Sequence, residues 1–89
     1  MALRSRLVLT TAISLYPNPA TSQIKVTSIQ ALADANIQIM DGQGKTVMVI
    51  NGVSGTSINV NIYRLASGMY TMRVQISRNV SSVNFLKTN

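Results

Sequence analysis

Apolar and polar residues alternate along most of this 89-residue chain. In the clearest run, 70–77, every second position is apolar, as a half-buried β-strand requires. The segment 57–62 repeats the pattern, and shorter alternating runs occur at 24–27 and 37–39. The period of two predicts strands rather than helices over most of the chain.

Proline, glycine and asparagine separate these runs. Pro17 and Pro19 end the first strand, because proline has no backbone N–H to donate to a ladder. Asp41-Gly42-Gln43-Gly44 is the clearest hairpin turn, and we interpret the glycine-containing segment 51–55 as the next reversal. The pattern predicts about seven strands, near 7–15, 22–28, 35–41, 45–50, 56–62, 69–77 and 80–87.

Several short strands at this spacing are typical of a two-sheet antiparallel sandwich. We therefore expect an all-β fold, an immunoglobulin-like antiparallel β-sandwich, although alternation does not give the strand order. A short helical turn at 28–33 is a local alternative, because Gln30-Ala31-Leu32-Ala33 includes good helix formers. The length allows one domain, 13–89, preceded by 1–12 as a linker and the start of the first strand, with Met1 interpreted as an added start.

The composition argues against catalysis. The chain has no Cys and no His, which removes thiolate chemistry, a histidine base and the usual zinc ligands. Asp34 and Asp41 are the only acids, and both lie in stretches that have the composition of turns. We therefore predict that the protein is not an enzyme and has no catalytic residue, no cofactor and no metal site.

Eight Lys and Arg against two acids give a net charge of +6. These cations are spread singly, without a basic run or an interleaved aromatic platform, so we expect no nucleic-acid partner. We interpret them as solvated side chains that keep a small domain soluble. The alternative is attraction to an anionic partner, such as a bacterial surface rich in lipopolysaccharide.

Three short motifs follow one another along the chain. The first is Leu15-Tyr16-Pro17-Asn18-Pro19-Ala20-Thr21, the second is a strand that ends in a Gly44-Lys45 turn, and the third runs from Leu65 to Tyr70. Together they resemble the type A C-terminal sorting domain of the Bacteroidetes type IX secretion system, also called the Por secretion system, over roughly the whole of 13–89. The positions that carry the resemblance are Tyr16, Pro17, Asn18, Pro19, Gly44, Lys45, Leu65, Gly68 and Tyr70.

Each motif also has a structural interpretation. Pro17 and Pro19 fix φ on both sides of Asn18, whose side chain can bond to nearby backbone groups. Gly44 can adopt a left-handed conformation that other residues resist. We expect Tyr70 to bury its ring while its hydroxyl finds a partner. These residues are therefore interpreted as determinants of the fold before they are interpreted as receptor contacts.

The resemblance implies a secretion signal. In this family the domain directs a cargo protein through the periplasm and across the outer membrane, to the cell surface or the outside. A sortase-like protease commonly cuts in the preceding linker, here near 4–9, and the cargo is attached to lipopolysaccharide or released. The implied partners are the type IX machinery: the outer-membrane translocon, a shuttle protein and the sortase.

The last predicted strand, 80–87, is the candidate receptor contact. It can offer backbone groups and alternate side chains to a receptor by strand addition, with Val83, Phe85 or Leu86 as anchors and Lys87 reading an acidic rim. The other interpretation is an ordinary strand that closes the sandwich. An exposed edge also predicts dimers of the isolated domain. Many family members end with two or more lysines, whereas this tail has only Lys87.

A second class of function stays open at this point. The chain could be an immunoglobulin-like adhesive or carbohydrate-binding module retained on an extracellular protein. Such modules usually display aromatic platforms. The aromatic residues are Tyr16, Tyr63, Tyr70 and Phe85, of which Tyr70 is expected to face inward.

Overall fold

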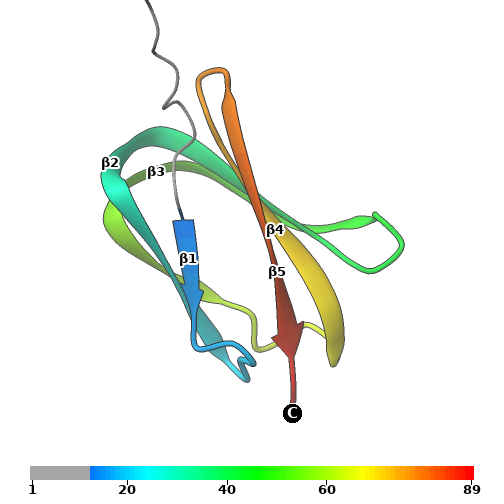
Figure 1. Ribbon diagram of the computed structural model, residues 1–89. Coiled ribbons are helices and arrows are strands. Elements are labelled where there is room, and N and C mark those ends of the chain that lie inside the picture. The colour runs from blue at the N-terminus through cyan, green and yellow to red at the C-terminus, as the bar shows by residue number, and fades with distance from the viewer. Residues whose placement is uncertain (1–12) are drawn as a thin grey trace, which may run out of the picture.

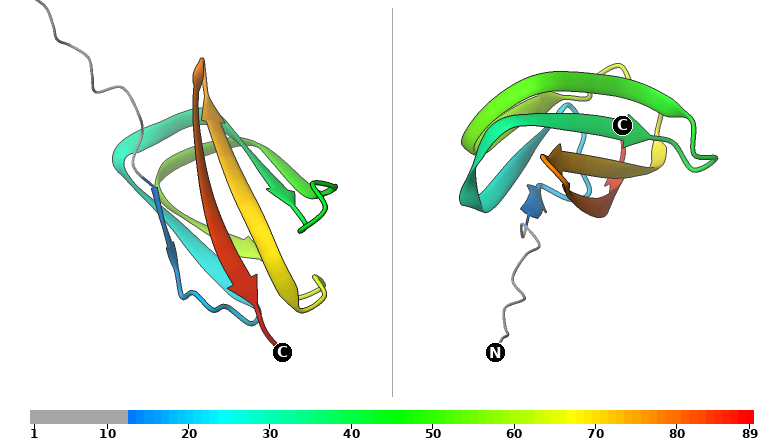
Figure 2. Two further views of the ribbon diagram at one scale, coloured as in Figure 1. Left: turned by 45° about the vertical axis from the view of Figure 1, so that its right-hand side comes forward. Right: turned by 90° about the horizontal axis from the view of Figure 1, so that it is seen from above.

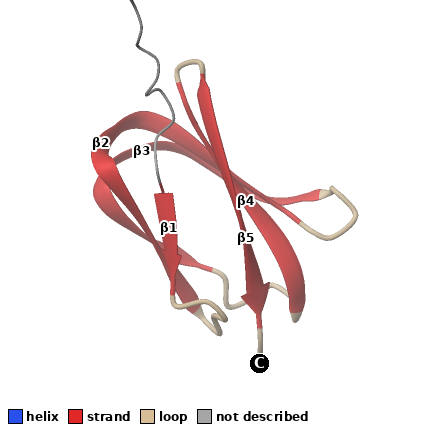
Figure 3. Ribbon diagram, in the orientation of Figure 1, coloured by secondary structure: helices blue, strands red, loops and turns tan. Residues whose placement is uncertain are grey.

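The computed structural model describes residues 13–89, and within them every regular element is a strand (Figure 3). All strand pairs are antiparallel, as expected for alternating segments that are joined by tight turns and short loops. The predicted all-β antiparallel fold is confirmed. The five strands are β1 (Ile13–Tyr16), β2 (Gln23–Met40), β3 (Thr46–Asn61), β4 (Gly68–Ile76) and β5 (Asn79–Lys87), as Figure 1 shows.

The five strands form one sheet that curls on itself. The order is β1-β2-β4-β5, and β3 pairs with β2 as well. Because β2 is long, its first half pairs with β1 and its second half pairs with β4. The sheet curls until β1 contacts β5, which leaves a nearly closed barrel (Figure 2).

The predicted immunoglobulin-like sandwich of about seven strands is not what the structure shows. The segments 22–28 and 35–41, predicted as two strands, are parts of the single strand β2. Likewise, 45–50 and 56–62 are parts of β3. Segments that were predicted as separate strands are therefore continuous in β2 and β3.

The cause is a bend in the paired strands β2 and β3. Their register shifts between Thr27 and Leu32 and again near Ala35, which marks bulges in the ladder. On β3, Gly52 and Gly55 have φ values of 71° and 113°, which favour glycine because it has no Cβ. The predicted reversal at 51–55 and the alternative helical turn at 28–33 are thus both wrong, since both segments belong to the bent strands.

The core fills the inside of the curl. Its side chains come from alternate positions, as the sequence pattern predicts, and the cross-strand pairs Ile37–Val74 and Ile39–Met72 are buried at its centre. Burial of these aliphatic groups is the main favourable contribution to folding. The buried hydrophobic residues are Ala20, Ile24, Val26, Leu32, Ala35, Ile37, Ile39, Val60, Ile62, Tyr70, Met72, Val74 and Phe85.

The first part of the chain lies outside the described residues. This applies to the predicted linker, 1–12, and to most of the first predicted strand, 7–15, of which β1 is the described part. In the described part of the chain, no helix is long and apolar enough to cross a membrane.

Candidate recognition site at the C-terminal strand

The side chain of Asn18 joins the first motif to the last strand. Asn18 follows β1 in a segment whose two X–Pro peptide bonds, before Pro17 and Pro19, are cis. Its Oδ1 accepts a hydrogen bond from the Leu86 backbone N–H at 3.0 Å. Its Nδ2 donates to the Asn84 carbonyl at 3.4 Å. The amide therefore bonds to the edge of β5 much as a short piece of neighbouring strand would.

Ala20 extends this contact along β5. Its N–H donates to the Leu86 carbonyl at 2.9 Å, and its carbonyl accepts from the Thr88 N–H at 2.8 Å. Ala20 also forms a parallel bridge with Lys87, and its own side chain is buried. The first motif thus covers the edge of β5 over its last residues.

The second motif forms a turn that its aspartate holds together. Asp41 Oδ1 accepts hydrogen bonds from the backbone N–H groups of Gln43 and Lys45, both at 2.9 Å. These two bonds, that from Lys45 first, hold the pKa of the Asp41 carboxyl below its ordinary value of 3.8. Gly44 has a φ of 84°, which confirms the predicted left-handed conformation. Lys45 itself is exposed.

The third motif fixes the start of β4. The Tyr70 ring is buried, with 8% of its surface exposed, and its hydroxyl donates to the Ala66 carbonyl at 2.6 Å. This confirms the expected inward ring with a partner for its hydroxyl. Leu65 packs against the core, and Gly68 begins the strand with a φ of 154°.

Tyr70 also connects the third motif to β5. It lies directly opposite Phe85 on the neighbouring strand, and the two rings stack with their centroids 5.6 Å apart and an angle of 21° between their planes. Such a pair adds to the stability that burial of the rings already provides. Two of the three motifs therefore contact the last strand directly, a relation that the linear sequence does not show.

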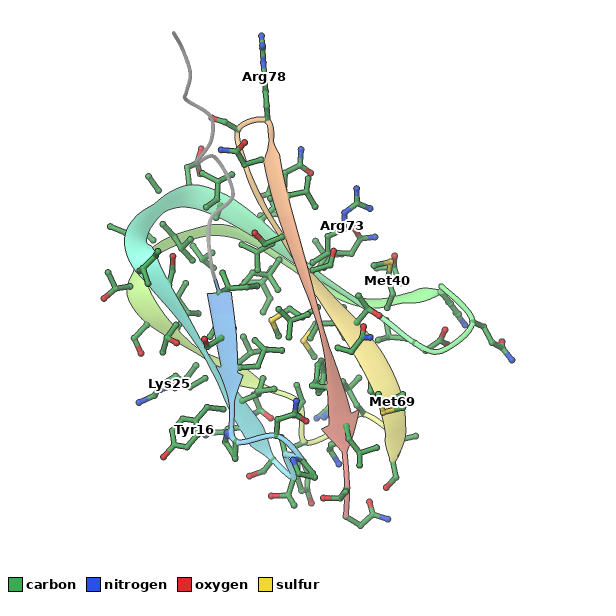
Figure 4. All side chains as sticks on the ribbon, in the orientation of Figure 1. Tyr16, Lys25, Met40, Met69, Arg73 and Arg78 are labelled. Carbon is green, nitrogen blue, oxygen red and sulfur yellow. The ribbon has the colours of Figure 1, made fainter. Side chains whose placement is uncertain are left out.

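The four predicted receptor contacts lie on two different faces of β5. Val83 is half-buried and Phe85 is only 1% exposed, and both face the interior. Lys87, the next residue on that face, is 4% exposed. Leu86 is half-buried on the outer face, directly opposite Met69, of which 54% is exposed. Figure 4 labels Met69 at the beginning of β4.

Two surface pockets lie beside residues of the first motif. One, of about 190 Å³, is lined by Tyr16, Pro17, Gln23, Lys25 and Asn59. Tyr16, Lys25 and Asn59 lie directly opposite one another on β1, β2 and β3, and Tyr16 is 65% exposed. Figure 4 shows Tyr16 and Lys25 side by side. The other pocket, of about 460 Å³, is lined by Thr21, Ser22, Tyr63, Lys87, Thr88 and Asn89.

Three cations of the described residues lie apart from one another. Lys25, Arg73 and Arg78 extend from separate parts of the sheet, with Arg78 at the tip of the β4–β5 hairpin (Figure 4). Among residues 13–89, no group of three or more side chains could hold a metal ion.

Comparison with known proteins agrees with the three motifs. Residues 14–87 match the sequence model of the family described as the secretion system C-terminal sorting domain of the Por system. No curated protein matches the chain. The matched range begins in β1 and ends at the last residue of β5, so it spans all five strands.

Proposed function

The chain belongs to the family of secretion-system C-terminal sorting domains, and from this premise we propose that the machinery recognises the end of β5. Membership makes the chain a secretion signal for a cargo protein of the type IX system, and the family is not enzymatic. It implies contact with the type IX machinery and transport of the cargo across the outer membrane, to the surface or the outside.

The observation that carries the proposal is the pair formed by the exposed Met69 and the half-buried Leu86. The two side chains are opposite each other on the outer face, at the end of the sheet where the first motif also contacts β5. Exposed apolar side chains beside polar groups are typical of recognition surfaces. Val83 and Phe85 pack on the opposite, inner face of β5 and hold this part of the strand against the core.

Strand addition to β5 is a more demanding alternative. Asn18 and Ala20 already bond to the edge of β5 between Asn84 and Thr88. A receptor strand would have to displace them and replace their hydrogen bonds. Contact with the outer face requires no such displacement, and we therefore favour it.

An export assay tests the proposal. Residues 1–89 are fused behind a signal peptide and a fluorescent reporter in a Bacteroidetes species, with and without a working type IX system. We expect the reporter outside the cell only where the system works, and we expect the double variant Met69→Ser/Leu86→Ser to stay in the periplasm. Export of that variant at the wild-type level would refute recognition through this surface.

A matched control is available on another part of the outer face. Val47 and Val49 are exposed residues of β3, and the double variant Val47→Ser/Val49→Ser removes similar apolar surface. We expect it to be exported normally. Circular dichroism and thermal unfolding of the purified variants show that each one is folded before its export is compared.

We also propose the finer steps that the family implies. The outer-membrane translocon, the shuttle protein and the sortase act on this domain in turn. Cleavage falls near 4–9, and the cargo is then attached to lipopolysaccharide or released.

Within the described residues β3 pairs with β2 alone, so its second edge is the place for a dimer contact. Size-exclusion chromatography with light scattering tests the dimer.

One observation favours saccharide binding as a second function. The exposed ring of Tyr16 stands beside Gln23, Lys25 and Asn59, and an aromatic ring flanked by amide groups suits one face of a sugar ring. A glycan array with the wild-type chain and Tyr16→Ala tests this function. Binding that is lost in Tyr16→Ala would support it, and the absence of binding to any glycan would exclude it.

A further inference from the structure

Lys87 is a buried cation at the end of β5. Only 4% of its surface is exposed, and its one hydrogen bond runs from Nζ to the Thr88 carbonyl at 3.2 Å. An ammonium group has three donors, so two remain available. Lys87 forms no ion pair with any residue between 13 and 89.

The chain offers Lys87 no counter-ion of its own among the side chains. The only acids are Asp34 and Asp41. Asp41 Oδ1 accepts two backbone hydrogen bonds in its own turn, and Asp34 is exposed where β2 bends. Buried charges in proteins are normally paired, because removing an ion from water costs free energy that only a partner can offset.

The pocket beside Lys87 provides room for such a partner. It measures about 460 Å³, and the hydroxyl-bearing residues Thr21, Ser22, Tyr63 and Thr88 line it together with Lys87. The Thr88 hydroxyl donates to the Ala20 carbonyl at 3.4 Å, which leaves Thr21, Ser22 and Tyr63 as the donors for an anion. Tyr63 is 71% exposed at its rim. Hydroxyl groups can donate to an anion whose charge the ammonium balances. The pocket is formed where the chain after the first motif, the chain after β3 and the C-terminal tail converge.

We propose that this pocket binds a carboxylate group carried by a partner protein, with Lys87 supplying the charge and the hydroxyls of Thr21, Ser22 and Tyr63 donating hydrogen bonds. The single cation matches the single charge of a carboxylate. A phosphate carries up to two negative charges and is often held at a helix N-terminus, whereas this pocket has Lys87 as its one cation and the described residues have no helix. The identity of the partner rests on the proposed sorting function, whereas the chemistry of the pocket does not.

The test is an NMR titration of the ¹⁵N-labelled 89-residue chain at constant pH. Sodium acetate is compared with sodium chloride at equal ionic strength, and sodium phosphate is a third arm. We expect acetate to shift the backbone amide signals of Thr21, Ser22 and Thr88 to saturation, and chloride to give no saturable shift. Repeating the titration on a C-terminally amidated chain removes the terminal carboxylate of Asn89 as a competitor.

Two variants make the outcome specific. In Lys87→Met the saturable shift should disappear, while the matched exposed-site variant Lys45→Met should keep it. Lys87→Met should also unfold at a temperature equal to or above that of the wild type without acetate, because it removes an unpaired buried charge. Acetate should raise the unfolding temperature of the wild type and of Lys45→Met, but not that of Lys87→Met. Lys87→Gln serves the same purpose if the Met variant does not fold.

The proposal is overturned by an equal acetate response in Lys87→Met and wild type, by a linear response in all chains, or by tighter binding of phosphate than of acetate. Failure here is distinct from failure of the sorting function, since export is measured separately. If acetate binds and Lys87→Met is still exported normally, the partner does not belong to the secretion machinery. Loss of both acetate binding and export in Lys87→Met supports the assignment.

Discussion

Replacing Asn18 by alanine should loosen the last strand. The change removes the hydrogen bond from the Leu86 N–H to Oδ1, at 3.0 Å, and the longer one from Nδ2 to the Asn84 carbonyl, at 3.4 Å. A net hydrogen bond contributes about 0.5–1.5 kcal/mol. The longer bond is at the weak end of this range, so we expect Asn18→Ala to lower the free energy of unfolding by about 1–2 kcal/mol.

Thermal unfolding measures the effect directly. In a domain of this size, each kcal/mol corresponds to a shift of about 4–8 °C in Tm. The control is Asn51→Ala, because Asn51 is exposed on β3 and forms no side-chain hydrogen bond within residues 13–89. Asn51→Ala should change the free energy of unfolding by no more than about 0.5 kcal/mol, so its Tm should shift correspondingly little.

Hydrogen exchange shows where the loosening occurs. The Leu86 amide loses its acceptor in Asn18→Ala, so it should exchange faster than in the wild type. The amide of Val74, in the centre of β4, should change only as far as global stability does. Equal Tm values for Asn18→Ala and the wild type, with unchanged protection of Leu86, would refute the role that we assign to this side chain.

Three further predictions concern the turn and the stacked pair. Stability should fall as the pH drops below 3.8 and through the lowered pKa of Asp41, because the folded state favours the carboxylate form of this side chain. Unfolding measured over an acid pH series should show a smaller loss in Asp41→Asn, which keeps an acceptor oxygen but does not titrate. Tyr70→Phe removes the bond to Ala66 and should cost about 1 kcal/mol in urea unfolding, without moving the ring. Phe85→Ala should cost about 3–5 kcal/mol and leave little folded protein by circular dichroism; a cooperative transition near the wild-type midpoint would contradict its place in the core.

The sequence pattern predicts the class of this fold and the inward residues well. Alternation follows directly from the geometry of a strand with one buried face, so Met72 and Val74 could be placed inside without a structure. The hydroxyl partner of Tyr70 and the conformation of Gly44 were also predictable in kind, because each follows from local chemistry.

The number of strands could not be predicted in the same way. Gly52 and Gly55 are the kind of residue that marks a turn. A bulge uses glycine at positive φ in the same way, so the sequence does not distinguish a bulge from a turn here. Only the pairing with Leu32 and Ala35 on β2 shows that the chain bends instead of reversing. That pairing is tertiary information, which a single sequence does not contain.

The candidate site was predicted in part. Its motif residues were identified, but the contact between Asn18 and β5 joins positions 66 and 68 residues apart, and no local signal connects them. Lys87 was expected to read an acidic rim of a receptor, whereas its side chain is almost wholly buried in the domain, unlike most lysines. The contacts of Ala20, Asn84 and Thr88 were missed because they rest mainly on backbone groups, which every residue has.

The bond between Asn18 and the last strand has a consequence for biosynthesis. Because Leu86 and Thr88 bond to Asn18 and Ala20, the barrel cannot close until residues 86–88 have left the ribosome. A polypeptide that stops before Phe85 leaves Tyr70 unstacked and Asn18 without its partners. Closure of this small fold is therefore a record that the ribosome has synthesised the chain through β5.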